Sequence, residues 1–242
     1  MRFSVISLFP GQIDAFLKES IIGRAREKRI IDIDFYDIRD YSGNPYGKVD
    51  DTLYGGGTGM LIQCEPVYRC YEDVCSSGKP YVIYVSPKGK VLDQKKVREL
   101  AGKDHIAILC GHYEGIDSRV TDEIVDEEIS IGDYVLTGGE IAAVTIIDSV
   151  SRMIEGVLPN EDAYTNESHM NGTLEASQYT KPRIWHDREV PEVLLNGNQA
   201  QIDDYNRTMS LVETMDKRPD MFDKLALTEE DWQKVLARKR QN

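Results

Sequence analysis

HIAILCGHYEGID, residues 105–117, decides the fold of this chain because it joins an apolar run directly to a loop that contains two glycines. A short apolar run bounded by turn residues is typical of a strand buried in a parallel sheet. YVIYVSPKGK (81–90) and EIVDEEISIGDYVLTGGE (123–140) repeat this arrangement on either side. We therefore predict strands at 105–110, 81–85 and 123–131, each followed by a glycine-bearing loop.

The segments outside this region alternate between strand and helix patterns. A strand is predicted at RFSVISLF (2–9), and residues 31–38 alternate apolar and polar side chains, as a half-buried strand does. Apolar residues at helical spacing predict a helix over 11–28, after Pro10. Strands that alternate with helices indicate an α/β domain with a mostly parallel sheet over residues 1–158. Further helices are expected at 65–76, 93–101 and 141–154.

The expected helix IAAVTIIDSVSRMI (141–154) is apolar almost all round, so it is buried either in a core or in a subunit interface. The composition changes after it. Residues 159–176 are polar and without a clear period, which is typical of a flexible linker. Helix candidates at 198–217 and 228–240 predict a small, mainly helical domain over 177–242.

The bulk composition argues against several classes of protein. The net charge of −13 argues against a generic nucleic-acid binder, although a local basic patch would still allow RNA binding. No run of 18 apolar residues exists, and the start MRFSVISLFPGQ is unlike a signal peptide, so we expect a cytoplasmic protein without a membrane span. The four cysteines fit no common zinc spacing and are expected to be free thiols, so no metal site is predicted.

The three glycine-bearing loops are candidates for one ligand site. Ligands bind at the carboxyl ends of strands in open α/β sheets, and glycine lets the backbone approach a ligand closely. Standard nucleotide motifs do not fit, because YGGGTGM (54–60) lacks the partners of a phosphate loop and by itself is only a flexible loop. No G-x-S-x-G nucleophile elbow is present. Of the four histidines, His112 lies inside the second glycine loop and is the best candidate for substrate contact.

Longer motifs occur over nearly the whole chain. CGHYEGID (110–117) and DEEISIGDYVLTGGE (126–140) are two of them, and GHYEGID and SIGDYVLTGGE are highly specific when found together. The other motifs are VISLFP (5–10), VDDTLYGGGTGM (49–60), SPKGK (86–90), GVL (156–158), QYTKP (178–182), VPEVLLNGN (190–198) and LALTEE (225–230). Taken in their order along the chain, these motifs resemble those of the bacterial tRNA (guanine-37-N1)-methyltransferases.

The resemblance implies an α/β fold with a deep trefoil-knotted methyltransferase domain, a topology that general rules of chain connectivity would exclude. It implies methyl transfer from S-adenosylmethionine to N1 of guanine 37 of tRNA, next to the anticodon. It also implies a homodimer whose active sites are shared between chains, and a dependence on magnesium.

In the family the three glycine loops hold the cofactor. Adenine needs backbone donors and acceptors together with apolar walls, which side chains of these loops can supply. For Tyr134 and Leu136, packing in the core is the competing interpretation. Carried onto this sequence, the implied cofactor contacts are Tyr84, Ser86, Pro87, Gly111, Tyr113, Glu114, Gly115, Ile131, Gly132, Asp133, Tyr134, Val135, Leu136, Gly138 and Gly139.

Methylation of guanine N1 needs a base for the N1 proton and a cation for charge that develops on O6. The family's arginine matches Arg152, and its linker aspartate falls at Glu167, which is one methylene longer. A misplacement of about 1 Å can cost roughly a hundredfold in rate. Glu161, Asp162 and Glu175 are alternative bases, and Glu167 as a solvated linker residue is the competing interpretation.

Contact with tRNA is implied for His112, Lys181 and Arg183, with guanine 37 flipped out of its stack. The family tends to carry an arginine-rich helix start where this chain has Asp203 and Asp204, so we expect tRNA binding to be modest or salt-sensitive. Two other hypotheses stay open. One is a knotted methyltransferase that acts on a ribose hydroxyl or on ribosomal RNA, and the other is a cofactor-binding regulator that has lost catalysis.

Overall fold

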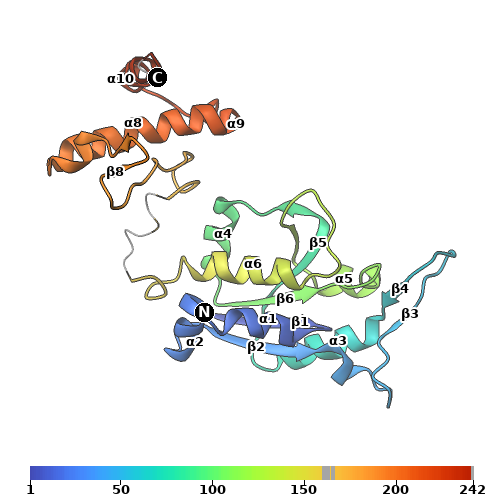
Figure 1. Cartoon of the computed structure of the whole chain (residues 1–242). Coiled ribbons are helices and arrows are strands. Elements are labelled where there is room, and N and C mark those ends of the chain that lie inside the picture. Colours follow the sequence, from blue (N-terminus) through green and yellow to red (C-terminus); the bar gives the residue numbers. More distant parts are fainter. Residues whose placement is uncertain (160–163, 165–166, 241–242) are drawn as a thin grey trace. The chain divides into compact units, whose positions relative to one another are not determined.

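The computed structural model describes residues 1–159, 164 and 167–240 of the chain. The chain divides into two compact units, Met1–Asn160 and Glu161–Asn242, each with its own hydrophobic cluster. Figure 1 labels their helices and strands. Within the described ranges, no helix is both long and apolar enough to cross a membrane.

A five-stranded parallel sheet with the order β2-β1-β6-β5-β7 forms the centre of the first unit. β1 and β6 lie inside the sheet and bury five of their six residues each, as the apolar runs predict. The prediction of an α/β unit with a parallel sheet is therefore confirmed. The strands are Arg2–Ser7 (β1), Asp32–Asp37 (β2), Tyr81–Val91 (β5), His105–Cys110 (β6) and Glu127–Ser130 (β7).

Three of these strands end side by side at the carboxyl edge of the sheet. Val85 of β5 is in register with both Cys110 of β6 and Ile129 of β7. The register of β5 then shifts, and Lys90 is also aligned with Ile129. Residues 86–89 therefore leave the regular ladder at this edge, where the segments that follow β6 and β7 also begin.

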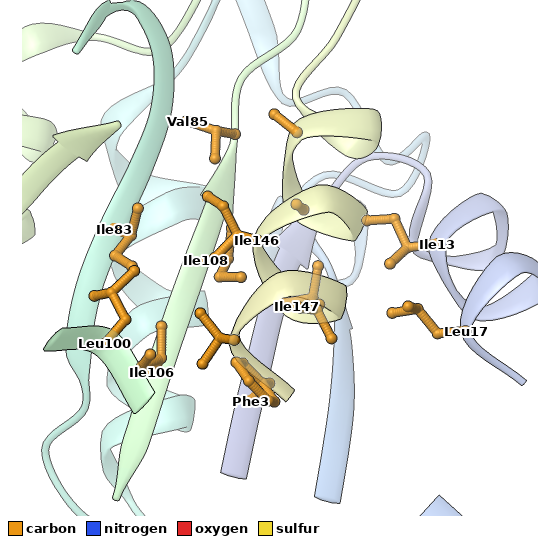
Figure 2. Packing of buried hydrophobic residues seen from close by; sticks show 14 of the residues in the cluster. Phe3, Ile13, Leu17, Ile83, Val85, Leu100, Ile106, Ile108, Ile146 and Ile147 are labelled. Carbon is orange, nitrogen blue, oxygen red and sulfur yellow. The ribbon is translucent and has the colours of Figure 1, made fainter. Parts of the chain in front are cut away.

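One face of the sheet is covered by α1 (Pro10–Leu17), α4 (Gln94–Ala101) and α6 (Glu140–Ser151). Ile146 and Ile147 of α6 are fully buried in this cluster, and Figure 2 shows them among side chains of α1 and the strands. Burial in its own unit thus accounts for the apolar character of this helix.

The opposite face is covered by α3 (Cys64–Cys75) and α5 (Ser118–Ile124). Val67 of α3 and Val120 of α5 pack with Leu109 of β6 in a second apolar cluster. Both faces of the sheet are therefore buried, as a parallel sheet requires.

The predicted helix over 11–28 is wrong in one respect, because it is two helices, α1 and α2 (Ser20–Glu27). The chain turns between them at Ser20, whose φ of +58° is in the left-handed region. A side chain at Gly23 would collide with the carbonyl group of Lys18, so glycine permits this tight turn. Helical spacing alone could not reveal the break.

The predicted strand over 123–131 is too long. Its first residues belong to α5, and only residues 127–130 form β7. Asp117 begins α5 by accepting a hydrogen bond from the backbone N–H of Arg119. A helix of two turns carries too few apolar positions to show a clear period.

The glycine-rich segment 54–60 was expected to be only a flexible loop, but its last residue belongs to a hairpin. β3 (Asp50–Thr52) pairs in antiparallel fashion with β4 (Met60–Ile62). The Met60 carbonyl accepts a 3.0 Å bond from the N–H of Glu114, and the N–H of Ile62 donates a 3.0 Å bond to the Gly115 carbonyl. The hairpin therefore supports the second glycine loop.

The second unit is mainly helical in its described part. Its helices are α8 (Gln199–Lys217), α9 (Pro219–Phe222) and α10 (Glu229–Lys239), preceded by a short hairpin of β8 (Ile184–Trp185) and β9 (Arg188–Glu189). Thr228 and Asp231 form a capping box that begins α10. A small apolar cluster holds these helices together through Leu211, Val212, Phe222 and Val235.

Substitution of Ile147 by alanine should lower the free energy of unfolding of the first unit by about 2–5 kcal/mol, because it leaves a cavity in a fully buried cluster. Ile141 lies on the same helix but is 61% exposed, so Ile141→Ala should cost less than about 0.5 kcal/mol. Urea denaturation followed by circular dichroism measures both. Equal losses in the two variants would contradict the packing of α6.

Candidate active site

A cavity of about 440 Å³ lies at the carboxyl edge of β5, β6 and β7, where the three glycine loops meet. The loops were predicted to converge on one ligand site, and they share this cavity. Fourteen of the 15 implied cofactor residues contribute to its wall, and Asp133 does not. Sequence reasoning missed other wall residues, among them Lys88, Ser118, Thr121, Asp122, Glu128 and Ala142.

The first loop is held close to the sheet. The Ser86 hydroxyl is buried and accepts a 3.1 Å bond from the N–H of Lys88, which closes a tight turn. A Cβ at Gly89 would lie 2.5 Å from the backbone of Glu128 and Ile129, so only glycine allows the loop to return to β7.

The second loop turns at Tyr113, whose φ is +58°, and at Gly115, whose φ is +114°. The N–H of Gly115 donates to the His112 carbonyl at 3.0 Å, so the turn is closed by its own backbone. The His112 ring packs edge-on against Phe9 and Tyr113, with ring centroids 5.0 and 4.9 Å apart. His112 also lies in the cavity wall.

The third loop is closed by Ser130, whose hydroxyl donates to the Gly132 carbonyl at 2.9 Å and accepts from its N–H at 3.2 Å. The side chains that follow are not packed in the core. Tyr134 is 55% exposed, Val135 83% and Leu136 37%, which rules out the core-packing interpretation of Tyr134 and Leu136. These side chains are available as apolar walls for a flat ring.

The second and third loops are joined at a point where no side chain fits. The N–H of Gly139 donates a 2.9 Å bond to the Gly111 carbonyl, and His112 forms an isolated antiparallel bridge with Gly138. A Cβ at Gly139 would lie 2.5 Å from the Val85 side chain and 2.9 Å from the backbone of Cys110. The close approach of β5, β6 and the start of α6 therefore depends on glycine.

Glu140, the first residue of α6, is only 7% exposed. Its carboxylate accepts a 2.8 Å hydrogen bond from the Ser7 hydroxyl of β1, and Ser7 also accepts from the N–H of Phe9 at 2.8 Å. The helix dipole favours a negative charge at this position. The sequence signal was present in the last letter of SIGDYVLTGGE, but no role was assigned to it.

Tyr84 and Glu128 are cross-strand neighbours at the floor of the cavity. Burial, and secondarily the Glu128 carboxylate, raise the pKa of Tyr84 above its ordinary value. The Tyr84 hydroxyl would lie within 3.2 Å of a Cβ at either Gly111 or Gly115, so these glycines make room for the tyrosine side chain.

The two implied catalytic residues belong to different units. Arg152 caps the C-terminus of α6, and its positive charge partly offsets the effect of burial, which raises the pKa of Asp148. Glu167 is partly buried in the second unit, and its N–H donates to the Tyr164 carbonyl at 3.3 Å. The alternative bases Glu161 and Asp162 lie outside the described residues.

The implied tRNA-binding residues of the second unit are exposed. Lys181 and Arg183 lie just before β8. Arg183 forms a 2.6 Å ion pair with Glu189 of β9. One of the acidic residues at the start of α8 forms an ion pair within the second unit, because Asp204 lies 2.5 Å from Lys234 of α10. Part of its charge is therefore neutralised before any RNA approaches.

Among the described residues, no group of three or more His, Cys, Asp or Glu side chains is placed to hold a metal ion. All four cysteines are free, and burial raises the pKa of the Cys70 and Cys110 thiols. Neither thiol is prepared for nucleophilic chemistry.

The family model for tRNA (Guanine-1)-methyltransferase TrmD matches residues 1–224. The chain belongs to this family. The tRNA (guanine-N(1)-)-methyltransferase of Ruminiclostridium cellulolyticum is 52% identical to it over 228 residues, which are 93% of this chain and 97% of the relative. The proteins of the same name from Clostridioides difficile and Staphylococcus carnosus are 47% and 44% identical, over 93% and 98% of this chain and 98% and 96% of theirs.

Substitution of Gly139 by alanine should weaken binding of S-adenosylmethionine by about tenfold or more, because the new methyl group pushes apart the loops that form the cavity. Gly11 on α1 has no atom within 4 Å of its Cβ position, so Gly11→Ala should bind the ligand normally. Isothermal titration calorimetry of both variants makes the comparison. Normal binding by Gly139→Ala would refute the role of this contact.

The Asp117 carboxylate should stabilise the first unit only above acidic pH. Its hydrogen bonds to the Arg119 side chain, at 2.7 and 3.0 Å, hold the pKa of Asp117 well below its ordinary value. The stabilisation is present above the unfolded pKa of about 3.9 and is lost as the pH falls through the lower folded value. Asp117→Asn should cost about 0.5–1 kcal/mol at pH 7, and the difference from wild type in urea denaturation should shrink below pH 4. A difference that does not change with pH would contradict this account.

Proposed function

We propose that this protein transfers a methyl group from S-adenosylmethionine to N1 of guanine at position 37 of tRNA. The observation that carries the proposal is the cavity formed by three glycine loops, in a chain that belongs to the tRNA (guanine-1)-methyltransferase family over nearly its whole length. The names of its relatives support guanine as the base and N1 as the atom that is methylated. The resemblance of the sequence motifs supports S-adenosylmethionine as the methyl donor and position 37 as the site in tRNA.

The cavity wall fits the proposed cofactor. Backbone groups of the third loop provide donors and acceptors for an adenine edge, while Tyr134 and Leu136 provide exposed apolar surface. A side chain at Gly111, Gly138 or Gly139 would collide with neighbouring atoms. Glycine at these positions therefore lets the backbone lie close to the ligand. When bound, S-adenosylmethionine supplies an electrophilic methyl group on a positively charged sulfur.

In this proposal the protein supplies the proton transfer and the charge stabilisation. The Glu167 carboxylate takes the N1 proton of guanine, and the Arg152 guanidinium stabilises charge that develops on O6. Glu167 lies in the segment that the sequence predicts to be a flexible linker, so docking of tRNA would order this segment and complete the site. This requirement would keep water away from the donor until the substrate has docked.

The wider assembly is proposed on the same resemblance. A deep trefoil knot in the first unit would surround the cofactor loops, and a homodimer would share each active site between chains. The proposal also includes a requirement for magnesium, a cytoplasmic location, and contacts with tRNA from His112, Lys181 and Arg183. Salt-sensitive tRNA binding is expected, because Lys181 and Arg183 of the second unit are exposed cations in an acidic protein.

Incubation with S-adenosylmethionine, magnesium and a tRNA transcript bearing guanine 37 should yield 1-methylguanosine, identified by mass spectrometry after digestion. Glu167→Ala should lower the rate at least about a hundredfold, in line with loss of a general base. Glu167→Asp, the family's usual residue, keeps a carboxylate but shortens the side chain by one methylene, so its rate should lie between those of wild type and Glu167→Ala. Asp223→Ala is the matched control, because it removes an exposed carboxylate of the second unit that is not a candidate base.

The outcomes separate the hypotheses. Equal product from wild type and Glu167→Ala would keep the function and move the base to Glu161, Asp162 or Glu175. A methylated ribose in place of 1-methylguanosine would indicate another knotted methyltransferase. Binding of the cofactor without any methylated product would favour the regulator that has lost catalysis.

A further inference from the structure

The His112 ring has a buried polar atom on the edge that faces the third loop. Its Nδ1 atom is shielded from solvent and has no hydrogen-bond partner among the described residues. The ring is held in place, because it packs edge-on against Phe9 and Tyr113 and because the backbone of His112 is bridged to Gly138. A buried ring nitrogen without a partner costs free energy, so a group that could bond to it is informative.

The buried Glu140 carboxylate lies on the same side of the ring. Among the described residues, the Ser7 hydroxyl is the one hydrogen-bond donor found for it, and that bond goes to Oε1. A Cβ at Gly138 would lie 2.3 Å from Oε2 of Glu140 and 2.6 Å from Nδ1 of His112. These two atoms are therefore at most about 5 Å apart, a gap that a small side-chain rotation or one water molecule closes.

Both groups are fixed by the end of β1. Ser7 donates to Glu140 and accepts from the N–H of Phe9, whose ring packs on His112. The space between the carboxylate and the imidazole exists because residue 138 is glycine, since any side chain there would overlap both groups. The start of α6, the end of β1 and the second glycine loop are thus arranged around this pair.

We propose that Glu140 is a positioning residue that holds His112 in the tautomer with its proton on Nδ1. The dipole of α6 favours the charged carboxylate, which can only accept hydrogen bonds, and a carboxylate bonded to one ring nitrogen sets the tautomer of an imidazole. Nε2 lies on the ring edge away from Gly138 and is then left as a hydrogen-bond acceptor for the substrate. The proposal rests on the proposed function, in which His112 contacts tRNA.

Nitrogen NMR spectroscopy of isotope-labelled histidine tests the pairing without tRNA, because the chain has only four histidines. In wild type the His112 signals should show a proton on Nδ1. Glu140→Gln should shift them toward the form protonated on Nε2, because a neutral amide oxygen binds the Nδ1 proton more weakly than a carboxylate does. His112→Asn assigns the signals.

Two controls accompany this spectrum. Glu123→Gln removes the same charge from an exposed position of α5 and should leave the His112 signals unchanged. His105, at the start of β6, bonds to the Ser4 hydroxyl at 2.9 Å, and its signals should stay in place in every variant that is correctly folded.

Methylation of tRNA shows whether Glu140 acts through His112. Glu140→Gln should lower kcat/KM for tRNA by roughly tenfold and change the Kd of S-adenosylmethionine by less than about twofold, because Glu140 is not part of the cavity wall. In a His112→Asn background the same substitution should cause no further loss, because its partner is gone.

Unchanged His112 signals in Glu140→Gln would overturn the proposal. Shifts of all four histidines would also do so, because Glu140 would then support the fold as a whole, and so would additive losses in the double variant. If wild type does not methylate tRNA, the proposed function itself fails, whereas the NMR result still decides whether Glu140 sets the tautomer of His112.

Discussion

The close contact at Gly139 is the constraint on which the rest of the first unit depends. Its N–H is bonded to the Gly111 carbonyl, and a Cβ at this position would collide with Val85 and Cys110 at the ends of two strands. The next residue, Glu140, begins α6 and is anchored to β1 through Ser7. The third loop must therefore span a fixed gap between β7 and this point, and the cavity is the space that it encloses.

The sequence was sufficient to predict the parallel sheet, because short apolar runs bounded by turn residues and alternating with helices are typical of buried parallel strands. It also predicted that the three glycine loops share one cavity, since carboxyl ends of parallel strands meet at one edge. The break at Ser20 and the short helix after Asp117 escaped prediction because each depends on a local turn or cap within too few residues to show a period.

The candidate site divides in the same way. Residues within the glycine motifs could be assigned from sequence, because the motifs are continuous along the chain. Glu128 and the α5 residues could not, because their place in the wall follows from strand register and from how α5 packs. The acidic start of α8 had suggested weak RNA binding, but Asp204 also joins α8 to α10 through Lys234, which only the packed helices reveal.

The β3–β4 hairpin has a consequence for how this chain can change during evolution. Its three bonds to the second loop, made by Met60 and Ile62, involve backbone atoms alone and so do not depend on side-chain identity. Side chains of β4 can therefore change without loss of these bonds, whereas the tip keeps its glycines, because Gly55, Gly56 and Gly59 have positive φ values. An insertion or deletion within β4 is a different matter, because it would shift the register and displace the loop bonded to it. Side chains along β4 can drift while its length and the glycines at the tip are kept, and a long-diverged relative should show this asymmetry.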